Sequence, residues 1–472
     1  MAEIDEILID ASPGEVRAAL CADGRVVELA IERATRRSMV GDIHLARVER
    51  TASALDAAFL DLGADVPSGF LNIADTRRMP VEGEALLVQI AKDRTADKGP
   101  TLTARIALVG GYLVYRPGEA ERAVSARITD KQAVSRLQSW LSGRAGWTAR
   151  TAAAGASLTD LDEEEARLVK EWDAIGIAAR NAKPLSMLRR EPGLVMRLMR
   201  DHPGVRRIVF DAPAALAAAR RGAAERWPDM AGRLVPNDEG GALFEIRGIE
   251  DEIDRALEPR VALPHGASLV IEPMTAFVAI DVNTGAGRGR ASDAIWEANL
   301  AAAREIGRQI RLRNLSGRIV VDFIAMERRD RRESVLAALR AAVAADPQEV
   351  RVAGYTALGL VELARRRGRE SLAAQLCDPV AAPQKSALTI ALAALRRASS
   401  EAASAPGRAL ELRVSSDVAA ALEGEAKSAR LELEARLGRA LLLCAEAGRA
   451  RGDMDIGEAR MPVRLARATE RG

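Results

Sequence analysis

Apolar and polar residues alternate over short distances at the start of the chain, which is typical of β-strands. Residues 4–31 contain three such runs, and residues 40–115 contain several more, separated by turn residues. An isolated hairpin is only marginally stable in water, so the first strands need partners from elsewhere in the chain. We therefore expect a discontinuous first domain and a small barrel built from residues 40–115.

Strands and helices alternate further along the chain. Apolar positions have helical spacing in residues 160–180, and short strands alternate with an alanine-rich helix in residues 193–260. This order is typical of α/β folds. The tail, residues 383–472, has the order helix, strand, helix, strand and predicts a small α+β module.

Two long apolar strands flank an amphipathic helix in the region 265–326. The first of these strands contains Asp281 and the second contains Asp322. A strand, a long helix and a second strand indicate a parallel crossover, which places both carboxylates near neighbouring strand ends. Two aspartates from adjacent strands are then able to converge on one point.

Length and composition indicate a folded chain of several domains. The 472 residues correspond to roughly three or four domains, and 48% apolar with 29% charged residues exclude a disordered chain. The chain has neither a run of 18 apolar residues nor a basic leader, so we expect a cytoplasmic protein. Cys21, Cys377 and Cys444 are far apart, which predicts neither a disulfide framework nor a zinc knuckle.

The basic residues of the chain are strongly biased toward arginine. Only seven of the 69 basic residues are lysine, and the net charge is +2. Guanidinium groups hold phosphates bidentately and stack on bases, which favours an RNA partner, although a GC-rich genome produces the same bias. Phe59 and Phe70 lie on consecutive expected strands beside basic residues, a combination that suits single-stranded RNA. A barrel core would also accommodate these two phenylalanines.

A second phosphate-binding candidate is the segment GWTARTAAAG. It places Arg150 and Thr151 after a short strand and before a Gly/Ala-rich turn. An arginine beside a hydroxyl group and free backbone amides is able to cradle a phosphate.

Several motifs together resemble the ribonuclease E/G family. They follow in the family's order along nearly the whole chain: AAFLDLG (57–63), DKGPTLT (97–103), RTAAAG (150–155), AIDVNTG (279–285), ANLAAAREIGRQIRLRNLSGRIVVDFIAM (298–326) and GYTALGLVELARRRGRESL (354–372). The short length is closer to the ribonuclease G branch than to the ribonuclease E branch, which has a long disordered arm.

The resemblance implies a multidomain α/β and β fold. Its expected parts are an RNase H-like domain in two pieces (1–37 and 193–257), an inserted S1-type OB-fold (38–115), a 5′-sensor region (116–192), a DNase I-like catalytic domain (258–376), a degenerate zinc link or linker (377–406) and a small α+β C-terminal domain (407–472).

The resemblance also implies a role for individual residues. Magnesium would be held by Asp281 and Asp322, with Asn283 beside them as a third catalytic residue. The 5′-phosphate sensor would consist of Arg150 and Thr151. RNA would contact Phe59 and Phe70 of the OB-fold, together with Lys98. Among Arg365, Arg366 and Arg367, we expect Arg365 and Arg367 to face the RNA backbone or brace the site, whereas a solvated helix face is the alternative.

Two positions depart from the family pattern. The family has a paired-cysteine CPxC zinc link after the ESL motif, but this chain has ESLAAQLCDPVAAPQK and retains Cys377 alone. A tetrahedral zinc shared by two subunits needs two thiolates from each, so zinc is not expected, and any homodimer must rest on protein surfaces. Trp296 and Glu297 also replace the more usual Phe-Asn pair.

The expected function is magnesium-dependent endoribonuclease cleavage of single-stranded RNA, such as mRNA and rRNA precursors. The products would carry a 5′-phosphate and a 3′-hydroxyl, and 5′-monophosphorylated RNA would be favoured, as the resemblance implies. One alternative is a catalytically silent RNA-binding protein of the same fold, which retention of both aspartates argues against. A DNA nuclease is a further alternative, disfavoured by the RNA-type barrel.

Overall fold

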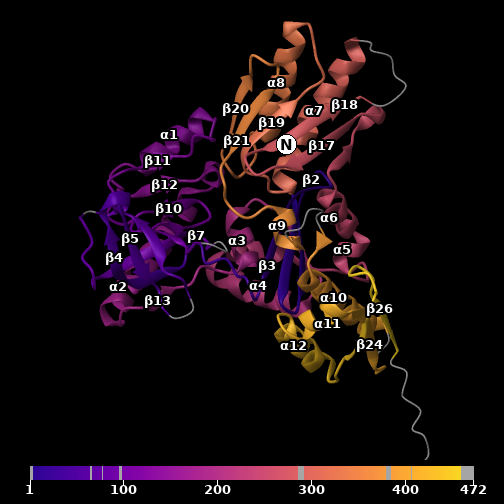
Figure 1. Cartoon of the computed structure of the whole chain (residues 1–472). Coiled ribbons are helices and arrows are strands. Elements are labelled where there is room, and N and C mark those ends of the chain that lie inside the picture. Colours follow the sequence, from indigo (N-terminus) through magenta and orange to yellow (C-terminus); the bar gives the residue numbers. More distant parts are fainter. Residues whose placement is uncertain are drawn as a thin grey trace, which may run out of the picture. The chain divides into compact units, whose positions relative to one another are not determined.

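The computed structural model describes residues 4–63, 66–76, 78–94, 98–284, 292–378, 384–404 and 407–458 (Figure 1). The chain divides into two compact units. One comprises residues 1–35, 206–218 and 233–472, and the other comprises residues 36–205 and 219–232. Parts of the expected linker, residues 379–383 and 405–406, lie outside the described residues.

The unit of residues 36–205 and 219–232 contains a closed five-stranded barrel. Its strands are β4 (Ile43–Ala52), β5 (Ala57–Asp61), β6 (Gly69–Asn72), β7 (Ala85–Lys92) and β8 (Thr101–Thr103), in the order β4-β5-β6-β8-β7. Pairing of β7 with β4 closes the barrel, and β13 (Ser186–Arg189) adds to β4. Alternate residues such as Val48, Leu60 and Leu71 fill the interior. The barrel expected from the alternating pattern is confirmed and is consistent with an OB-fold.

The second layer of this unit is a small sheet with its helices, and it follows the barrel strands in the chain. Its small sheet has the order β11 (Ala123–Val124), β12 (Trp147–Ala149), β10 (Leu113–Tyr115) and β9 (Leu108–Val109). Its helices are α1 (Lys131–Trp140), α2 (Leu158–Asn181) and α3 (Leu194–Asp201), and a short turn η3 (Thr151–Ala154) follows β12. Trp147, Leu137 and Leu161 share one buried core, which fixes the end of β12 where Arg150 follows.

The first sheet of the other unit combines strands from the start of the chain with two strands about two hundred residues later. Its order is β15 (Leu234–Pro236), β14 (Arg207–Phe210), β1 (Glu6–Ser12), β2 (Glu15–Ala22) and β3 (Arg25–Arg33). β1 runs antiparallel to β2 and parallel to β14. Helices α5 (Leu243–Ile246) and α6 (Ile249–Leu257) pack on it through an apolar core that includes Leu8, Phe244 and Ile253. Helix α4 (Pro213–Arg226) follows β14.

A six-stranded sheet in the same unit contains both aspartates. Its order is β16 (Arg260–Ala262), β17 (Ser268–Pro273), β18 (Val278–Asn283), β19 (Gly317–Asp322), β21 (Val361–Arg365) and β20 (Val350–Tyr355). Helices α7 (Ser292–Leu312) and α8 (Arg329–Val343) cover one face (Figure 1), where Ile306 and Leu339 meet Ile280, Ile319 and Val321. β18 and β19 are parallel and joined by α7, which confirms the expected crossover.

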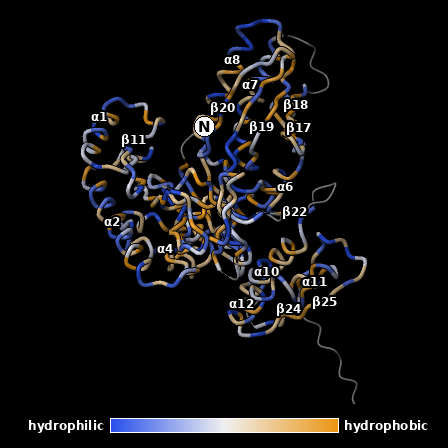
Figure 2. The backbone as a smooth tube through the Cα atoms, turned by 60° about the vertical axis from the view of Figure 1, so that its left-hand side comes forward, coloured by the Kyte–Doolittle hydropathy of each residue, from blue (hydrophilic) through white to orange (hydrophobic). Residues whose placement is uncertain are grey.

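The C-terminal part is a small α+β module. It contains α10 (Ala387–Ser404), β24 (Leu410–Ser415), α11 (Ser416–Glu423), α12 (Lys427–Leu437), β25 (Leu442–Glu446) and β26 (Asp455–Glu458). Three short elements precede it: α9 (Leu372–Leu376), whose leucines pack in the core of the first sheet, and the paired strands β22 (Cys377–Asp378) and β23 (Gln384–Lys385). The apolar positions of α10, seen as orange segments in Figure 2, pack on β24 through Leu392, Leu395 and Leu412. Across the described part of the chain, every helix is too short or too polar to cross a membrane.

Candidate active site and RNA-binding surfaces

The two aspartates are direct neighbours on adjacent strands. Asp281 of β18 pairs in register with Asp322 of β19, so both side chains lie on the face away from α7 and α8. Neighbouring strands are about 4.8 Å apart, which brings the two carboxylates close together. Both side chains are exposed, and Asn283 Nδ2 donates a hydrogen bond of 2.8 Å to Asp281 Oδ2. The structure therefore brings together Asp281, Asn283 and Asp322.

The chemistry of this group suits a hard divalent cation. Within the described ranges, neither Asp281 nor Asp322 forms an ion pair with arginine, lysine or histidine. Like charges on directly adjacent strand positions are destabilising unless a cation neutralises them. Mg²⁺ prefers oxygen ligands and commonly takes only one or two protein carboxylates. The described residues contain no set of three or more His, Cys, Asp or Glu side chains placed to hold a metal, so a cation here would take two protein carboxylates, Asp281 and Asp322.

A buried asparagine on α7 fixes the chain where it leaves β19. Asn299 is 0% exposed. Its Nδ2 donates to the carbonyl oxygen of Ile324 at 2.8 Å, and its Oδ1 accepts from the Ile324 amide at 3.1 Å. Ile324 lies two residues after Asp322, so this pair of bonds sets the direction of the segment that follows the carboxylate. Sequence reasoning did not single out Asn299 for this position.

The unusual Trp296 has a structural role. Its Nε1 donates to Ser334 Oγ at 2.8 Å, and the guanidinium of Arg331 lies 5.3 Å from its ring centroid. Trp296 is on α7 while Ser334 and Arg331 are on α8, so the side chain joins the two helices that support the sheet.

A further carboxylate on the same face was not expected from the sequence. Glu362 of β21 is exposed and pairs in register with Val320, which lies on the same face of β19 as Asp322. The sequence pattern that indicates an exposed Glu362 is the alternation in VELAR. There, buried Val361, Leu363 and Arg365 alternate with exposed Glu362 and Ala364.

Arg365, which we expected to face the RNA backbone or brace the site, is buried in the structure. Arg365 is 3% exposed and holds Asp346 through two hydrogen bonds, Nε to Oδ2 at 2.9 Å and Nη2 to Oδ1 at 3.1 Å. Its Nη1 donates to Asn314 Oδ1 at 2.7 Å and to the Leu315 carbonyl at 3.0 Å. Every guanidinium nitrogen has a protein partner, so Arg365 braces the sheet. Arg367, in contrast, is exposed and lies beside Gly317.

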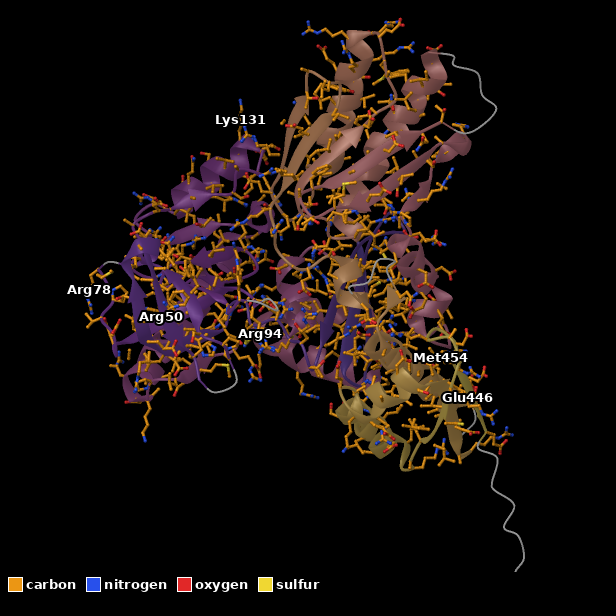
Figure 3. All side chains as sticks on the ribbon, in the orientation of Figure 1. Arg50, Arg78, Arg94, Lys131, Glu446 and Met454 are labelled. Carbon is orange, nitrogen blue, oxygen red and sulfur yellow. The ribbon has the colours of Figure 1, made fainter. Side chains whose placement is uncertain are left out.

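The two barrel phenylalanines lie outside the barrel interior. Phe59 and Phe70 pair in register on β5 and β6, and their rings meet edge to face at 5.9 Å between centroids. Both are partly exposed, and neither belongs to the buried interior cluster, so the barrel-core alternative does not hold. Arg50, labelled in Figure 3, pairs with Phe59 from β4 and places its guanidinium 3.9 Å from the ring centroid. Lys98 is exposed shortly before β8.

Arg50 was missed at the sequence level because its proximity to Phe59 depends on strand register. A bulge between Val48 and Arg50 shifts that register by one residue, and no local pattern indicates it. With the bulge in place, Arg50, Phe59 and Phe70 form one row across three strands.

Arg150 and Thr151 lie at the end of β12, as the first turn of η3 begins. Arg150 Nη1 donates to the Gly110 carbonyl, and Nη2 donates to Asp201 Oδ1 at 2.9 Å. Burial alone would raise the pKa of Asp201, but Arg200 and Arg150 hold this pKa below its usual value. Thr151 is exposed, and its hydroxyl shares a hydrogen bond of 3.0 Å with Ser125 Oγ. The two residues follow each other in the chain but have different partners, Asp201 for Arg150 and the Ser125 hydroxyl for Thr151.

A buried ionic cluster lies at the turn between β1 and β2. Arg17 contacts Asp10 and Glu250, and Glu15 contacts Arg33 and Arg396. Burial raises the pKa of Asp211 to about 7, and the adjacent charge of Asp10 adds to this shift. Burial would also raise the pKa of Asp10, but Arg17 and Arg396 keep that pKa below its usual value.

Known proteins are similar to this chain over most of its length. A family model described as "Ribonuclease E/G family" matches residues 107–368. Ribonuclease G of Escherichia coli (strain K12) is 34% identical over 401 residues, which are 79% of this chain and 82% of that protein. Ribonuclease G of Haemophilus influenzae is 32% identical with the same coverage. Ribonuclease E of a Nostoc strain is 33% identical over 75% of this chain and 55% of that protein. The chain belongs to the ribonuclease E/G family.

Proposed function

We propose that this chain is an endoribonuclease of RNA processing that cuts single-stranded RNA at the carboxylates of β18 and β19. The relatives are named ribonuclease G and ribonuclease E. The observation that carries the proposal is the exposed pair Asp281 and Asp322, in register and without a protein counter-cation among the described residues. A nuclease needs such a pair to face solvent, where the phosphodiester arrives.

Asp281 and Asp322 would hold magnesium, and Asn283 would keep Asp281 Oδ2 in place through its 2.8 Å hydrogen bond. When bound, magnesium activates a water molecule and stabilises the charge that develops on the phosphoryl oxygens. In the proposed reaction water adds to phosphorus, the bond from phosphorus to the 3′-oxygen breaks, and the 3′-oxygen takes a proton. The products are a 5′-phosphate and a 3′-hydroxyl. Asn299 holds the backbone after Asp322 and so maintains the spacing of the two carboxylates.

The barrel row of Arg50, Phe59 and Phe70 would bind the unpaired bases of the substrate. Aromatic rings stack on any base, and nearby cations offset the charge of the backbone. Phe59 and Phe70 are partly exposed on the outside of the barrel, where bases have access. Lys98 would add positive charge beside them.

Arg150 and Thr151 would recognise a 5′-monophosphate. A guanidinium and two hydroxyl groups, with Ser125 as the second, provide charge-assisted hydrogen bonds to phosphate oxygens. Asp201 fixes the orientation of Arg150, so fewer conformations are lost when the phosphate binds.

We propose the family's domain names for the observed parts. The sheet of β1–β3, β14 and β15 corresponds to the RNase H-like domain, the barrel to the S1-type OB-fold, the second layer to the 5′ sensor and the six-stranded sheet to the DNase I-like domain. A homodimer, if formed, would lack a zinc link, because Cys377 is the only cysteine near that position.

The decisive experiment is cleavage of a fluorescent AU-rich single-stranded oligonucleotide. We expect cleavage with magnesium and none with EDTA, and we expect Asp281→Asn to reduce the rate by about 100-fold or more because a metal ligand is lost. Asp330→Asn is the matched control, since Asp330 is an exposed carboxylate on α8 that pairs with Arg328.

Binding of the oligonucleotide without cleavage under any metal condition would contradict the nuclease proposal and favour a catalytically silent RNA-binding protein. Equal cleavage of DNA of the same sequence would contradict the RNA specificity. Full activity of the Asp281→Asn variant would show that cleavage does not depend on the pair Asp281 and Asp322.

A further inference from the structure

The open face of the six-stranded sheet has a second polar region at the opposite end from the carboxylates. Four exposed arginines, Arg318, Arg351, Arg366 and Arg367, line a hollow of about 580 Å³ together with Glu349, and the buried Arg365 also borders it. The set of the four exposed arginines and Glu349 is called the arginine hollow below. Arg318 is four residues before Asp322 on β19, so its Cα lies about 13 Å from that of Asp322 along the strand.

The register of the strands places Arg318 and Arg351 in one row. Arg318 pairs with Ala364 on β21, and Arg351 of β20 pairs with the same Ala364 from the other side. Ala364 is small, so it leaves space between the two longer side chains. Arg366 continues β21 on the same face, and its amide donates to the Glu349 carbonyl at 2.9 Å.

These guanidinium groups differ from most others in the chain because they are free of partners. All four side chains are exposed, and within the part of the chain that the structure describes none has an ion pair or side-chain hydrogen bond. Arg365 next to them shows the contrast, because it is buried against Asp346. Four unpaired cations around one hollow repel one another, so an anion that binds there is stabilised.

An exposed aromatic ring adjoins the row. Phe277 is 38% exposed and immediately precedes β18, whose Val278 pairs with Ile319, the residue after Arg318. A partly exposed ring beside guanidinium groups suits a nucleotide better than it suits a free inorganic anion, because bases stack on the ring while phosphates meet the cations.

We propose that the arginine hollow binds the backbone of the RNA substrate a few nucleotides away from the cleaved bond. The hollow and the carboxylates lie at opposite ends of one sheet face, so a single strand that lies along β19 reaches both. Arg318, Arg351, Arg366 and Arg367 hold phosphate oxygens, and Phe277 supports a base. This inference rests on the proposed function for the identity of the ligand as RNA.

The test is direct binding of single-stranded RNA in EDTA, where no cleavage occurs. The oligonucleotide is longer than the sheet face, and its affinity is measured by fluorescence anisotropy at several salt concentrations. For the double variant Arg318→Gln/Arg351→Gln we expect affinity about tenfold lower. The slope of log affinity against log salt should become less steep by about 1.4, since each phosphate contact to a single strand contributes about 0.7.

The matched control is Arg25→Gln/Arg255→Gln, which removes two exposed arginines of the same unit outside the hollow. Thermal unfolding by circular dichroism establishes that both double variants fold. A second measurement needs no variant: RNA should protect Arg318 and Arg351 from phenylglyoxal, as read by mass spectrometry.

Unchanged affinity and slope in the hollow variant would overturn the inference, as would an equal loss in the control or the absence of protection. Because binding in EDTA is independent of hydrolysis, these outcomes are distinct from failure of magnesium-dependent cleavage.

Discussion

Burial separates two kinds of arginine in this chain. Arg365 and Arg311 are each 3% exposed and pair with Asp346 and Glu28, so they act as internal braces. Arg318 and Arg351 are exposed and unpaired among the described residues, so their charge is available to a ligand. A buried arginine cannot be removed without leaving its carboxylate uncompensated, whereas an exposed one can. Arginine-rich composition alone does not make this distinction.

The proposed preference for a 5′-monophosphate is tested by removing the hydroxyl group of Thr151. We expect the chain to cut 5′-monophosphorylated RNA faster than triphosphorylated RNA, and we expect Thr151→Val to reduce that ratio by about five- to tenfold, because one hydrogen bond to a charged phosphate is lost. Cleavage rates on oligonucleotides that differ only at the 5′ end provide the measurement. Thr159→Val, an exposed threonine on α2, is the control. Equal rates on both substrates in the unmodified chain would contradict the assignment of Arg150 and Thr151.

At the scale of elements, the sequence predicts local features well and pairings between distant strands poorly. The segment β18–α7–β19 was predicted because two apolar strands and one amphipathic helix follow each other directly. A helix was the alternative for Arg365–Arg367. The segment instead forms strand β21 up to Arg365, because it pairs with β19 and β20. The tail helix also divides into α11 and α12, and β26 was not predicted. The strand pairings depend on partners remote in sequence, which no local pattern contains.

The contact of α7 with the segment after β19 makes Asn299 a positioning residue. We expect Asn299→Leu to lower kcat about tenfold and to raise the magnesium concentration needed for half-maximal rate, because a shift of Asp322 misplaces one ligand. KM for RNA should change little. Kinetics over a magnesium titration give these parameters separately.

Gln309→Leu is the control on the same helix. Gln309 is 3% exposed and bonds Glu305 and Arg313, so its loss destabilises α7 without touching the backbone after Asp322. If both variants raise the magnesium requirement equally, Asn299 is a general structural residue and not a positioning one.

At the scale of the molecule, a buried ionic cluster joins segments far apart in sequence. Glu15 of β2 pairs with Arg396 of α10, and Arg17 pairs with Glu250 at the start of α6. The residues in these pairs are separated by hundreds of positions, so composition and periodicity gave no indication of them. The motifs indicated the family and the carboxylate strands, but this cluster required the structure.

The cluster makes stability depend on pH through Asp211. Its folded-state pKa of about 7 is above the value of 3.8 for an exposed aspartate. The folded state therefore binds the proton more tightly, and the stabilisation is complete below about pH 3.8 and is lost as pH rises through 7. Between pH 5 and 8, we expect the free energy of unfolding to fall less for the Asp211→Asn variant than for the unmodified chain, because the amide has no proton to release.

Urea unfolding across this pH range measures the effect as a difference between the two proteins. Taking the difference cancels groups common to both, such as His44, whose pKa is lowered by burial. An identical pH dependence in both proteins would show that Asp211 does not retain a proton in the folded state.

The parallel pairing of β1 with β14 also has a consequence for synthesis on the ribosome. Residues 6–12 leave the exit tunnel about two hundred residues before their neighbour at 207–210, whereas all five barrel strands are complete by residue 103. Translation therefore delivers a finished barrel while the N-terminal sheet still has an unpaired edge on β1. Nascent chains must keep that edge from associating with other strands until β14 emerges.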